Sequence, residues 1–121
     1  MLIKNITIDG NGHTIDGSHQ ANIFKIPNAN TNIIIKNMIF INANGSVGGA
    51  INGFSQVINC TFINNTANYG GAIAGSNVYN SSFIDNYAKF SGGAISAGNA
   101  YNTTFTNNTA QCGGAIRRGR A

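Results

Sequence analysis

The most regular feature of the sequence is a short pattern of apolar and polar positions that recurs every 21 or 22 residues. The tetrapeptide Gly-Gly-Ala-Ile occurs at 48–51, 70–73, 92–95 and 113–116. A second marker, Asn-x-x-Phe, begins at Asn37, Asn59, Asn80 and Asn102 and keeps the same period. Because two independent markers hold one period through most of the chain, we interpret the sequence as a repeat protein.

Each repeat consists of short segments of β-branched and aromatic residues that are bounded by Asn and Gly. Such segments are typical of β-strands, and no apolar stripe with helical spacing competes with them. At about 3.3 Å per residue, one period provides three short strands and three bends. The pattern therefore predicts an all-β fold, a single-stranded parallel β-helix of about five coils. A leucine-rich repeat has a similar period, but this chain contains a single Leu.

Successive coils of a parallel β-helix stack about 4.8 Å apart, so equivalent residues lie above one another. We therefore expect one interior ladder of Phe40, Phe62, Phe83 and Phe105, and a second of Ile51, Ile73, Ile95 and Ile116. The recurring Asn of the second marker is expected to form a third interior ladder, because its amide both donates and accepts hydrogen bonds. The Gly-Gly pair is expected to allow a tight bend.

The repeat has two irregularities and an atypical start. One extra residue lies near 53–55 and another near 89–91. We place both in bends, because a one-residue shift inside a strand would turn its side chains to the wrong face. We treat 1–121 as a single domain in which 1–25 is an atypical first coil, 26–116 holds the regular repeats, and 117–121 is a basic tail.

Composition removes several classes of protein. The 121 residues include 21 Asn and 16 Gly but no Glu, which excludes a helical bundle. No apolar run approaches the roughly 20 residues of a membrane-spanning helix, so we expect no membrane insertion. Arg117, Arg118 and Arg120 supply three of the four net positive charges. The rest of the chain lacks a basic stripe, so we expect no nucleic-acid partner.

Few residues are candidates for chemistry. Asp9 and Asp16 are the only close acidic pair, and both stand in Asp-Gly dipeptides that are typical of turns. Enzymes that cleave acidic polysaccharides need two or three carboxylates in one place. The third acid, Asp85, lies several coils away. We therefore expect no enzymatic activity, no catalytic residue and no cofactor.

Metal and disulfide sites are also disfavoured. His13 and His19 have no Cys or acidic cluster at zinc-ligand spacing, so we expect no metal site. Cys60 and Cys112 lie two coils apart, an axial separation of about 10 Å, beyond the roughly 7 Å limit between the Cα atoms of a disulfide.

The alternation of Gly-Gly-Ala-Ile with Phe-x-x-Asn resembles the repeat of polymorphic outer-membrane proteins of the chlamydial type. It is also similar to repeats of adhesin-like surface proteins of methanogenic archaea. The second motif is matched at 62–65, 83–86 and 105–108, whereas 40–43 has Ala in place of the final Asn. The opening over 6–17 resembles the early coils of pectin-lyase-like β-helices. The resemblance implies a right-handed, pectin-lyase-like parallel β-helix with an adhesive or structural role.

The same resemblance implies an extracellular or cell-surface location. The first five residues lack the basic and apolar segments of a secretory signal. We therefore expect either that the protein stays inside the cell or that its export signal lies outside this sequence.

We expect a non-catalytic, adhesin-like module that presents a rigid ladder surface to a cell-surface protein or glycan. The candidate binding residues are the outward row Thr61, Ser82 and Thr104, together with Asn65, Asn86 and Asn108. An alternative is a fibre subunit, because open β-helix ends expose unpaired strands that favour head-to-tail homo-oligomers. A polysaccharide lyase or hydrolase remnant is a third, less favoured interpretation.

Overall fold

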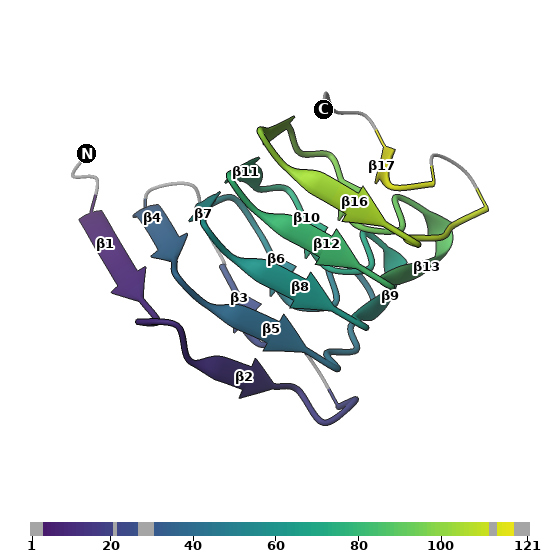
Figure 1. Cartoon of the computed structure of the whole chain (residues 1–121), viewed down its shortest axis with the longest axis horizontal. Coiled ribbons are helices and arrows are strands. Elements are labelled where there is room, and N and C mark those ends of the chain that lie inside the picture. Colours follow the sequence, from purple (N-terminus) through teal and green to yellow (C-terminus); the bar gives the residue numbers. More distant parts are fainter. Residues whose placement is uncertain (1–3, 21, 27–30, 112–113, 118–121) are drawn as a thin grey trace.

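The computed structural model describes residues 4–20, 22–26, 31–111 and 114–117. In these ranges the chain forms 17 short strands joined by bends and turns, and no helix. All strand pairs are parallel and connect one coil to the next (Figure 1). The predicted all-β, parallel coil is therefore confirmed.

The strands form three five-stranded sheets and one two-stranded sheet. The first sheet contains β1 (Lys4–Asp9), β4 (Thr31–Lys36), β7 (Gln56–Ile58), β11 (Asn77–Tyr79) and β15 (Ala100–Tyr101). The second contains β2 (Thr14–Asp16), β5 (Ile39–Ile41), β8 (Thr61–Ile63), β12 (Ser82–Ile84) and β16 (Thr104–Thr106). The third contains β3 (Phe24–Lys25), β6 (Ile51–Asn52), β10 (Ile73–Ala74), β14 (Ile95–Ser96) and β17 (Ile116–Arg117). The fourth pairs β9 (Thr66–Tyr69) with β13 (Tyr87–Ser91).

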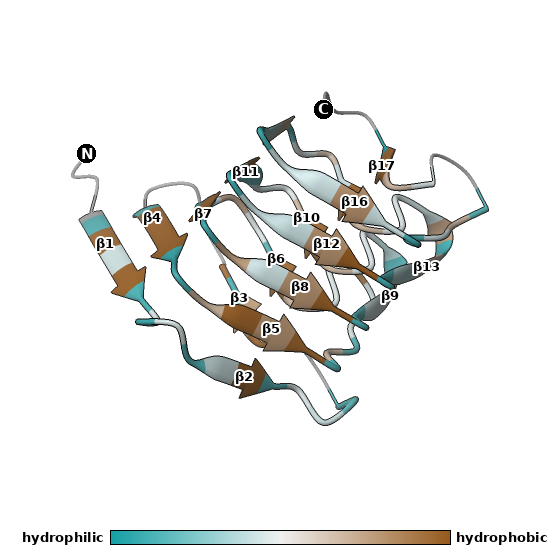
Figure 2. Cartoon of the chain, in the orientation of Figure 1, coloured by the Kyte–Doolittle hydropathy of each residue, from teal (hydrophilic) through white to brown (hydrophobic). Residues whose placement is uncertain are grey.

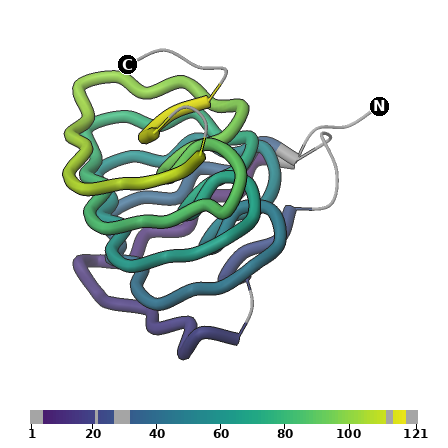
Figure 3. The backbone as a smooth tube through the Cα atoms, turned by 90° about the vertical axis from the view of Figure 1, so that its right-hand side faces the viewer, coloured from purple at the N-terminus to yellow at the C-terminus, as the bar shows by residue number. Residues whose placement is uncertain are grey.

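Each pass of the chain adds one strand to each of the three long sheets. Five passes give about four complete turns of a β-solenoid. Figure 3 shows these coils lying one upon another, from the purple amino-terminal coil to the yellow carboxy-terminal one. Apolar residues lie mainly on the strands and polar residues at the bends, as the brown and teal of Figure 2 show.

The core is built from stacked equivalent residues, as the period predicts. Phe40, Phe62 and Phe83 are wholly buried. Their rings stack with centroids 4.8 and 4.7 Å apart and planes within 11° of parallel, and Phe105 follows at 5.3 Å. A second wholly buried ladder consists of Ile51, Ile73 and Ile95, and a third of Ile35, Val57 and Val78. Each fully buried side chain of this size contributes about 1.5–3 kcal/mol to stability.

The first coil continues these ladders, but it has Ile where later coils have Phe and Phe where later coils have Ile. Ile15 pairs in register with Phe40, so an aliphatic side chain takes the aromatic position. Phe24 pairs with Ile51, and its ring meets Phe40 edge-on at 5.9 Å. The atypical first coil therefore keeps the architecture while its core packing differs.

The Gly-Gly pairs satisfy two different steric demands at one bend. In the first three pairs the first glycine has a left-handed backbone, with φ of 65° at Gly48 and Gly70 and 67° at Gly92. The second packs so closely on the next coil that a Cβ atom on Gly49 would collide with the Gly71 carbonyl oxygen. Only glycine meets both demands without strain.

One of the two extra residues lies where we expect it, and the other does not. The residue near 53–55 falls in the bend between β6 and β7. The residue near 89–91 falls inside β13, where the register against β9 shifts between Ala88 and Ser91. The prediction of a bend there is wrong: the strand absorbs the insertion as a β-bulge, which leaves the extra residue unpaired and preserves the register on either side.

The Asn residues of the second marker do not point inward. Asn59, Asn80 and Asn102 are exposed and Asn37 is half-buried, so the prediction of an interior ladder at these positions is wrong. All four have φ between 49° and 57°, the left-handed conformation that Asn tolerates at a sharp turn. They stand at the outer corner between the first and second sheets, and we call them the exterior amide ladder.

Candidate binding surface

The outer surface of the second sheet carries the predicted hydroxyl row. Phe40, Phe62 and Phe83 point into the core, so their neighbours in the strands face outward. The first outward row consists, in register, of Thr14, Ile39, Thr61, Ser82 and Thr104. The second consists of Asp16, Ile41, Ile63, Ile84 and Thr106. We call these ten residues the second-sheet face.

The hydroxyl row is a continuous and ordered part of this face. Ser82 pairs with Thr61 on one side and with Thr104 on the other. The Thr104 hydroxyl donates a hydrogen bond of 3.0 Å to Ser82 Oγ. Thr61 and Ser82 are half-buried and Thr104 is exposed. The structure therefore brings the three predicted residues together in one outward file, with a hydroxyl at each coil.

The exterior amide ladder borders this face along one side. Asn59 donates from its side-chain amide to Asn37 Oδ1 at 2.8 Å, and Asn102 donates to Asn80 Oδ1 at 2.7 Å. A hollow of about 380 Å³ lies at the junction, where Asn37 and Asn59 line it together with Ile39 and Thr61. Amides, hydroxyls and an aliphatic side chain thus converge on one shallow depression.

The second set of predicted binding residues lies in the interior instead. Asn65 and Asn86 are wholly buried and Asn108 is half-buried. The Asn65 amide donates to Asn86 Oδ1, and the Asn86 amide to Asn108 Oδ1, both at 2.9 Å. The burial of Asn65 and Asn86 contradicts our placing of these residues on a binding surface. We call the three the interior amide ladder.

Backbone groups complete the hydrogen bonding of this interior ladder. Asn86 Oδ1 also accepts from the Asn65 backbone N–H at 3.0 Å, and the Asn86 amide also donates to the Phe62 carbonyl at 3.0 Å. Among the described residues no buried side-chain nitrogen or oxygen lacks a partner. Because its buried polar groups are satisfied, the ladder fixes the bends after β8, β12 and β16 and offers no free group to a ligand.

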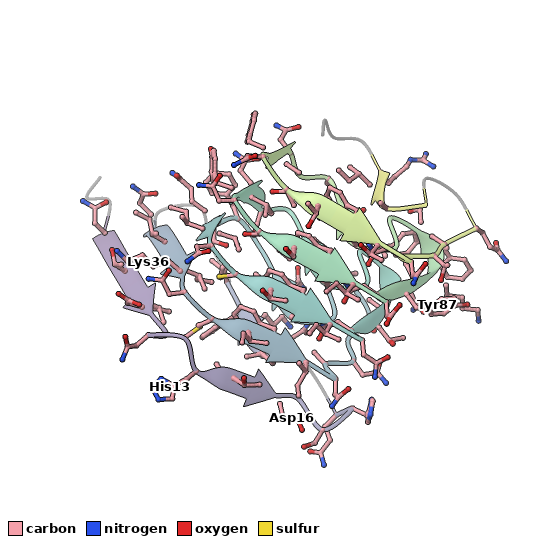
Figure 4. The ribbon with its side chains drawn as sticks, in the orientation of Figure 1. His13, Asp16, Lys36 and Tyr87 are labelled. Carbon is pink, nitrogen blue, oxygen red and sulfur yellow. The ribbon has the colours of Figure 1, made fainter. Side chains whose placement is uncertain are left out.

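The acidic residues of the first coil serve its turns. Asp9 accepts a hydrogen bond from the Asn11 backbone N–H at 3.0 Å, and Asp16 accepts one from that of Ser18 at 2.8 Å. The Asn11 bond, and then the Asn37 side-chain amide, lower the pKa of Asp9. Figure 4 shows His13, Asp16, Lys36 and Tyr87 lying apart from one another. Within the described ranges, no three His, Cys, Asp or Glu side chains gather closely enough to hold a metal ion.

Cys60 is the free, buried thiol of the described chain. It lies between the first and second sheets, and its Sγ donates to the Ile58 carbonyl at 3.4 Å. Burial raises the pKa of Cys60 from 9.0 to about 11, which keeps the thiol protonated and unreactive. Cys112, with which we expect Cys60 to form no disulfide, lies outside the described residues.

A pocket that sequence reasoning missed lies beside β13. It has a volume of about 430 Å³ and is lined by Tyr69, Phe90, Ser91, Ser96, Ala97, Gln111 and Arg117. The Tyr69 and Phe90 rings lie 5.4 Å apart at 40° and are both exposed. The available signal was the extra residue near 89–91, which marks the bulge that carries Phe90. We call this hollow the Phe90 pocket.

Two of the four segments that carry both repeat markers match a known family. The model of the Chlamydia polymorphic membrane protein repeat matches residues 59–76 and 102–117. In these two segments the chain is similar to that repeat. The matched segments include β8, β9 and β10 in one coil and β16 and β17 in another. No curated protein and no solved structure matches the chain. In the described residues no helix is long and apolar enough to cross a bilayer.

Proposed function

We propose that the repeats of this chain, two of which are similar to the polymorphic membrane protein repeat, form a non-catalytic, adhesin-like module at the cell surface, and that the second-sheet face binds its partner. The observation that supports the proposal best is the file of Thr61, Ser82 and Thr104, which lie in register on a parallel sheet. The family whose repeat matches is described as a membrane protein of Chlamydia, which supports a surface location.

The chemistry of the face favours a neutral partner. The strands β5, β8, β12 and β16 contain no charged residue. Hydroxyl groups alternate with the aliphatic row of Ile41, Ile63 and Ile84, which are half-buried. Such a surface hydrogen-bonds hydroxyl or amide groups and covers apolar area at the same time. A neutral glycan and an uncharged protein loop both meet this description.

The face is also rigid, which lowers the entropic cost of binding. Every strand of it is bonded to a neighbouring coil, and the interior amide ladder fixes the bends after β8, β12 and β16. Ligand groups therefore meet donors and acceptors at a fixed repeat of about 4.8 Å. A ligand with its own repeat, such as an oligosaccharide, gains from several such contacts at once.

The test is attachment of the purified chain to cultured epithelial cells and to an array of neutral glycans. The triple variant T61A/S82A/T104A removes the hydroxyl row, and we expect it to lose most of the attachment. The matched control is T7A/Q56A, which removes two polar side chains from the outer surface of the first sheet. Equal attachment by the triple variant, the control and the natural chain would remove this site from the proposal.

A second candidate function is self-assembly, and one observation favours it. Phe105 ends the stack of phenylalanines and is half-buried, whereas the three before it are wholly buried. The terminal strands β15, β16 and β17 each pair on one side only in the described chain. A second copy whose β1, β2 and β3 added to these edges would cover Phe105. Sedimentation velocity over a hundredfold range of concentration tests this, and a monomer throughout would exclude it.

A further inference from the structure

We propose that the Phe90 pocket is a binding site for a carboxylated sugar unit. The pocket lies between the fourth sheet and the outer surface of the third sheet, across the Gly-Gly bend at 92–93. It shares no residue with the second-sheet face. The proposal therefore adds a second site with a different ligand chemistry and does not depend on the hydroxyl row.

Two local departures from the repeat create the pocket. The extra residue in β13 leaves Lys89 and Phe90 facing the single residue Asn68 of β9, so Phe90 is displaced onto Tyr69. Ala97 has a φ of 59° at the position that Gly53 and Gly75 occupy in the preceding coils. A non-glycine residue in this left-handed region is strained, and such strain tends to occur at functional sites. Both departures meet at the same hollow.

The charge of the pocket is positive. Arg117 lines it from β17, and none of the lining residues is acidic. Lys89 brings a second cation to its rim, with Nζ 5.4 Å from the centroid of the Phe90 ring. A guanidinium presents a planar fork of donors that matches a carboxylate. These groups select an anionic ligand, in contrast to the second-sheet face, whose strands β5, β8, β12 and β16 carry no charged residue.

The remaining lining residues favour a sugar over a simple anion. Tyr69 and Phe90 are 44% and 39% exposed and form an aromatic platform on which the apolar face of a pyranose ring can lie. Ser91, Ser96 and Gln111 provide hydroxyl and amide groups at the same hollow, and these can bond sugar hydroxyls. Arg117 is half-buried, and its neighbour in register on β14 is the small Ser96. The volume of about 430 Å³ is within the range of small-ligand sites.

The experiment is an NMR titration of the isotopically labelled full chain with methyl β-D-glucuronide. Methyl β-D-glucoside, which lacks only the carboxylate, is the matched ligand control. We expect saturable shifts centred on Tyr69, Phe90 and Arg117 with the glucuronide, and at least tenfold weaker binding of the glucoside. The methyl glycoside of N-acetylneuraminic acid distinguishes a uronic acid from a sialic acid as the preferred source of the carboxylate.

Variants separate the two halves of the proposed site. We expect R117Q to weaken glucuronide binding roughly 10- to 100-fold, as the loss of a charge-assisted hydrogen bond does. We expect F90A to weaken it about fivefold or more through the lost apolar contact. The control F54A removes a phenylalanine of similar exposure outside the pocket and should leave binding unchanged. Far-ultraviolet circular dichroism and thermal unfolding report whether each variant folds.

Several outcomes would overturn the proposal. They are the absence of saturable shifts with either acidic sugar, equal binding of glucuronide and glucoside, and equal weakening by F54A and F90A. Equal affinity for acetate or for an acetylated aspartate peptide would show that the pocket reads only a carboxylate and not a sugar. If the variant T61A/S82A/T104A loses cell attachment but still binds the glucuronide, the second-sheet face and the Phe90 pocket are two independent sites.

Discussion

The two amide ladders are built from the same residue type at the same period, yet one lies inside the coil and the other outside. Asn65 and Asn86 are wholly buried, whereas Asn59 and Asn80 are exposed. The interior residues bond both the next amide and the backbone of a neighbouring coil. The exterior residues bond mainly along their own file and hold a left-handed backbone. The register of equivalent residues and the inward or outward direction of their side chains therefore have different physical causes.

Stacking follows from the repeat length, because equal coils place equal residues in register. Facing follows from the backbone at the corner. A left-handed residue turns the chain sharply, points its own side chain outward and lets the next residue point inward. Asn107 and Asn108 illustrate this, since the first has a φ of 54° and is exposed while the second is half-buried and bonded to the Phe83 carbonyl. We expect the two ladders to differ accordingly in what they contribute to stability.

The largest expected effect comes from breaking the interior ladder in its middle. Asn86→Ala removes four hydrogen bonds, two of which Asn86 donates and two of which it accepts from Asn65. Because the former partners stay buried without replacement, we expect a loss of about 3 kcal/mol in the free energy of unfolding. Urea denaturation measures it. A loss below that of the exterior variant N80A would contradict the assigned roles of the two ladders.

The buried thiol of Cys60 makes the stability of the chain depend on pH, which provides a test of its burial. Since the pKa of Cys60 is raised to about 11 in the folded chain, the folded state retains a proton that the unfolded state loses above pH 9. Stability from this group is therefore complete below pH 9 and falls as pH rises through 11, by an amount on the order of 2 kcal/mol. Denaturation of the natural chain and of C60A at pH 8 and 11 measures it. Parallel losses in both proteins would refute burial of the thiol.

A smaller effect distinguishes backbone from side chain in the exterior ladder. Asn80→Ala keeps a Cβ atom on a left-handed residue but removes the polar side chain with which Asn tolerates that conformation, and we expect a loss of about 1 kcal/mol. Asn80→Gly loses the same bond from Asn102 but suits the backbone, so we expect a change within about 0.5 kcal/mol of zero. If both variants lose stability equally, the amide bond and not the backbone conformation explains why Asn recurs at this position of the repeat.

The smallest effect concerns the end of the exterior ladder, where Asp9 accepts a bond of 3.1 Å from Asn37. The pKa of Asp9 is lowered by the Asn11 backbone N–H and by Asn37, so its contribution is present above its ordinary value of 3.8 and lost as pH falls below it. We expect D9N to abolish a slight acid destabilisation between pH 5 and 2. The matched control D85N removes an equal charge elsewhere, and an identical acid profile in both variants would exclude the proposed bonds as the cause.

The sequence is sufficient to predict the coil, the parallel pairing and the Phe and Ile ladders, because a strict period forces register. It is not sufficient to assign the facing of each Asn, since Asn is favoured both at left-handed corners and in buried amide ladders. One departure from the repeat does indicate which Asn position faces the interior. Ala43 replaces Asn65 in the preceding coil and is wholly buried, and a small apolar residue in an otherwise polar column indicates an interior position.

Of the two candidate binding surfaces, one is predictable from the sequence and the other is not. The hydroxyl row of Thr61, Ser82 and Thr104 follows from simple alternation next to a buried Phe, and its outward position is confirmed. The Phe90 pocket does not follow from periodicity, because it depends on a bulge and on contacts between different sheets. The extra residue near 89–91 indicates where the bulge lies in the sequence. That Arg117 and Phe90 line the same pocket is visible only in the folded chain.

The most direct test of the inside–outside assignment is hydrogen exchange of the Asn side-chain amides, followed by NMR in heavy water. We expect the amide protons of Asn65 and Asn86 to exchange slowly, since both side chains are buried and hydrogen-bonded within the ladder. Those of Asn59, Asn80 and Asn102 should exchange within the dead time of the experiment. Equal exchange in the two ladders, or slower exchange in the exterior one, would contradict the account.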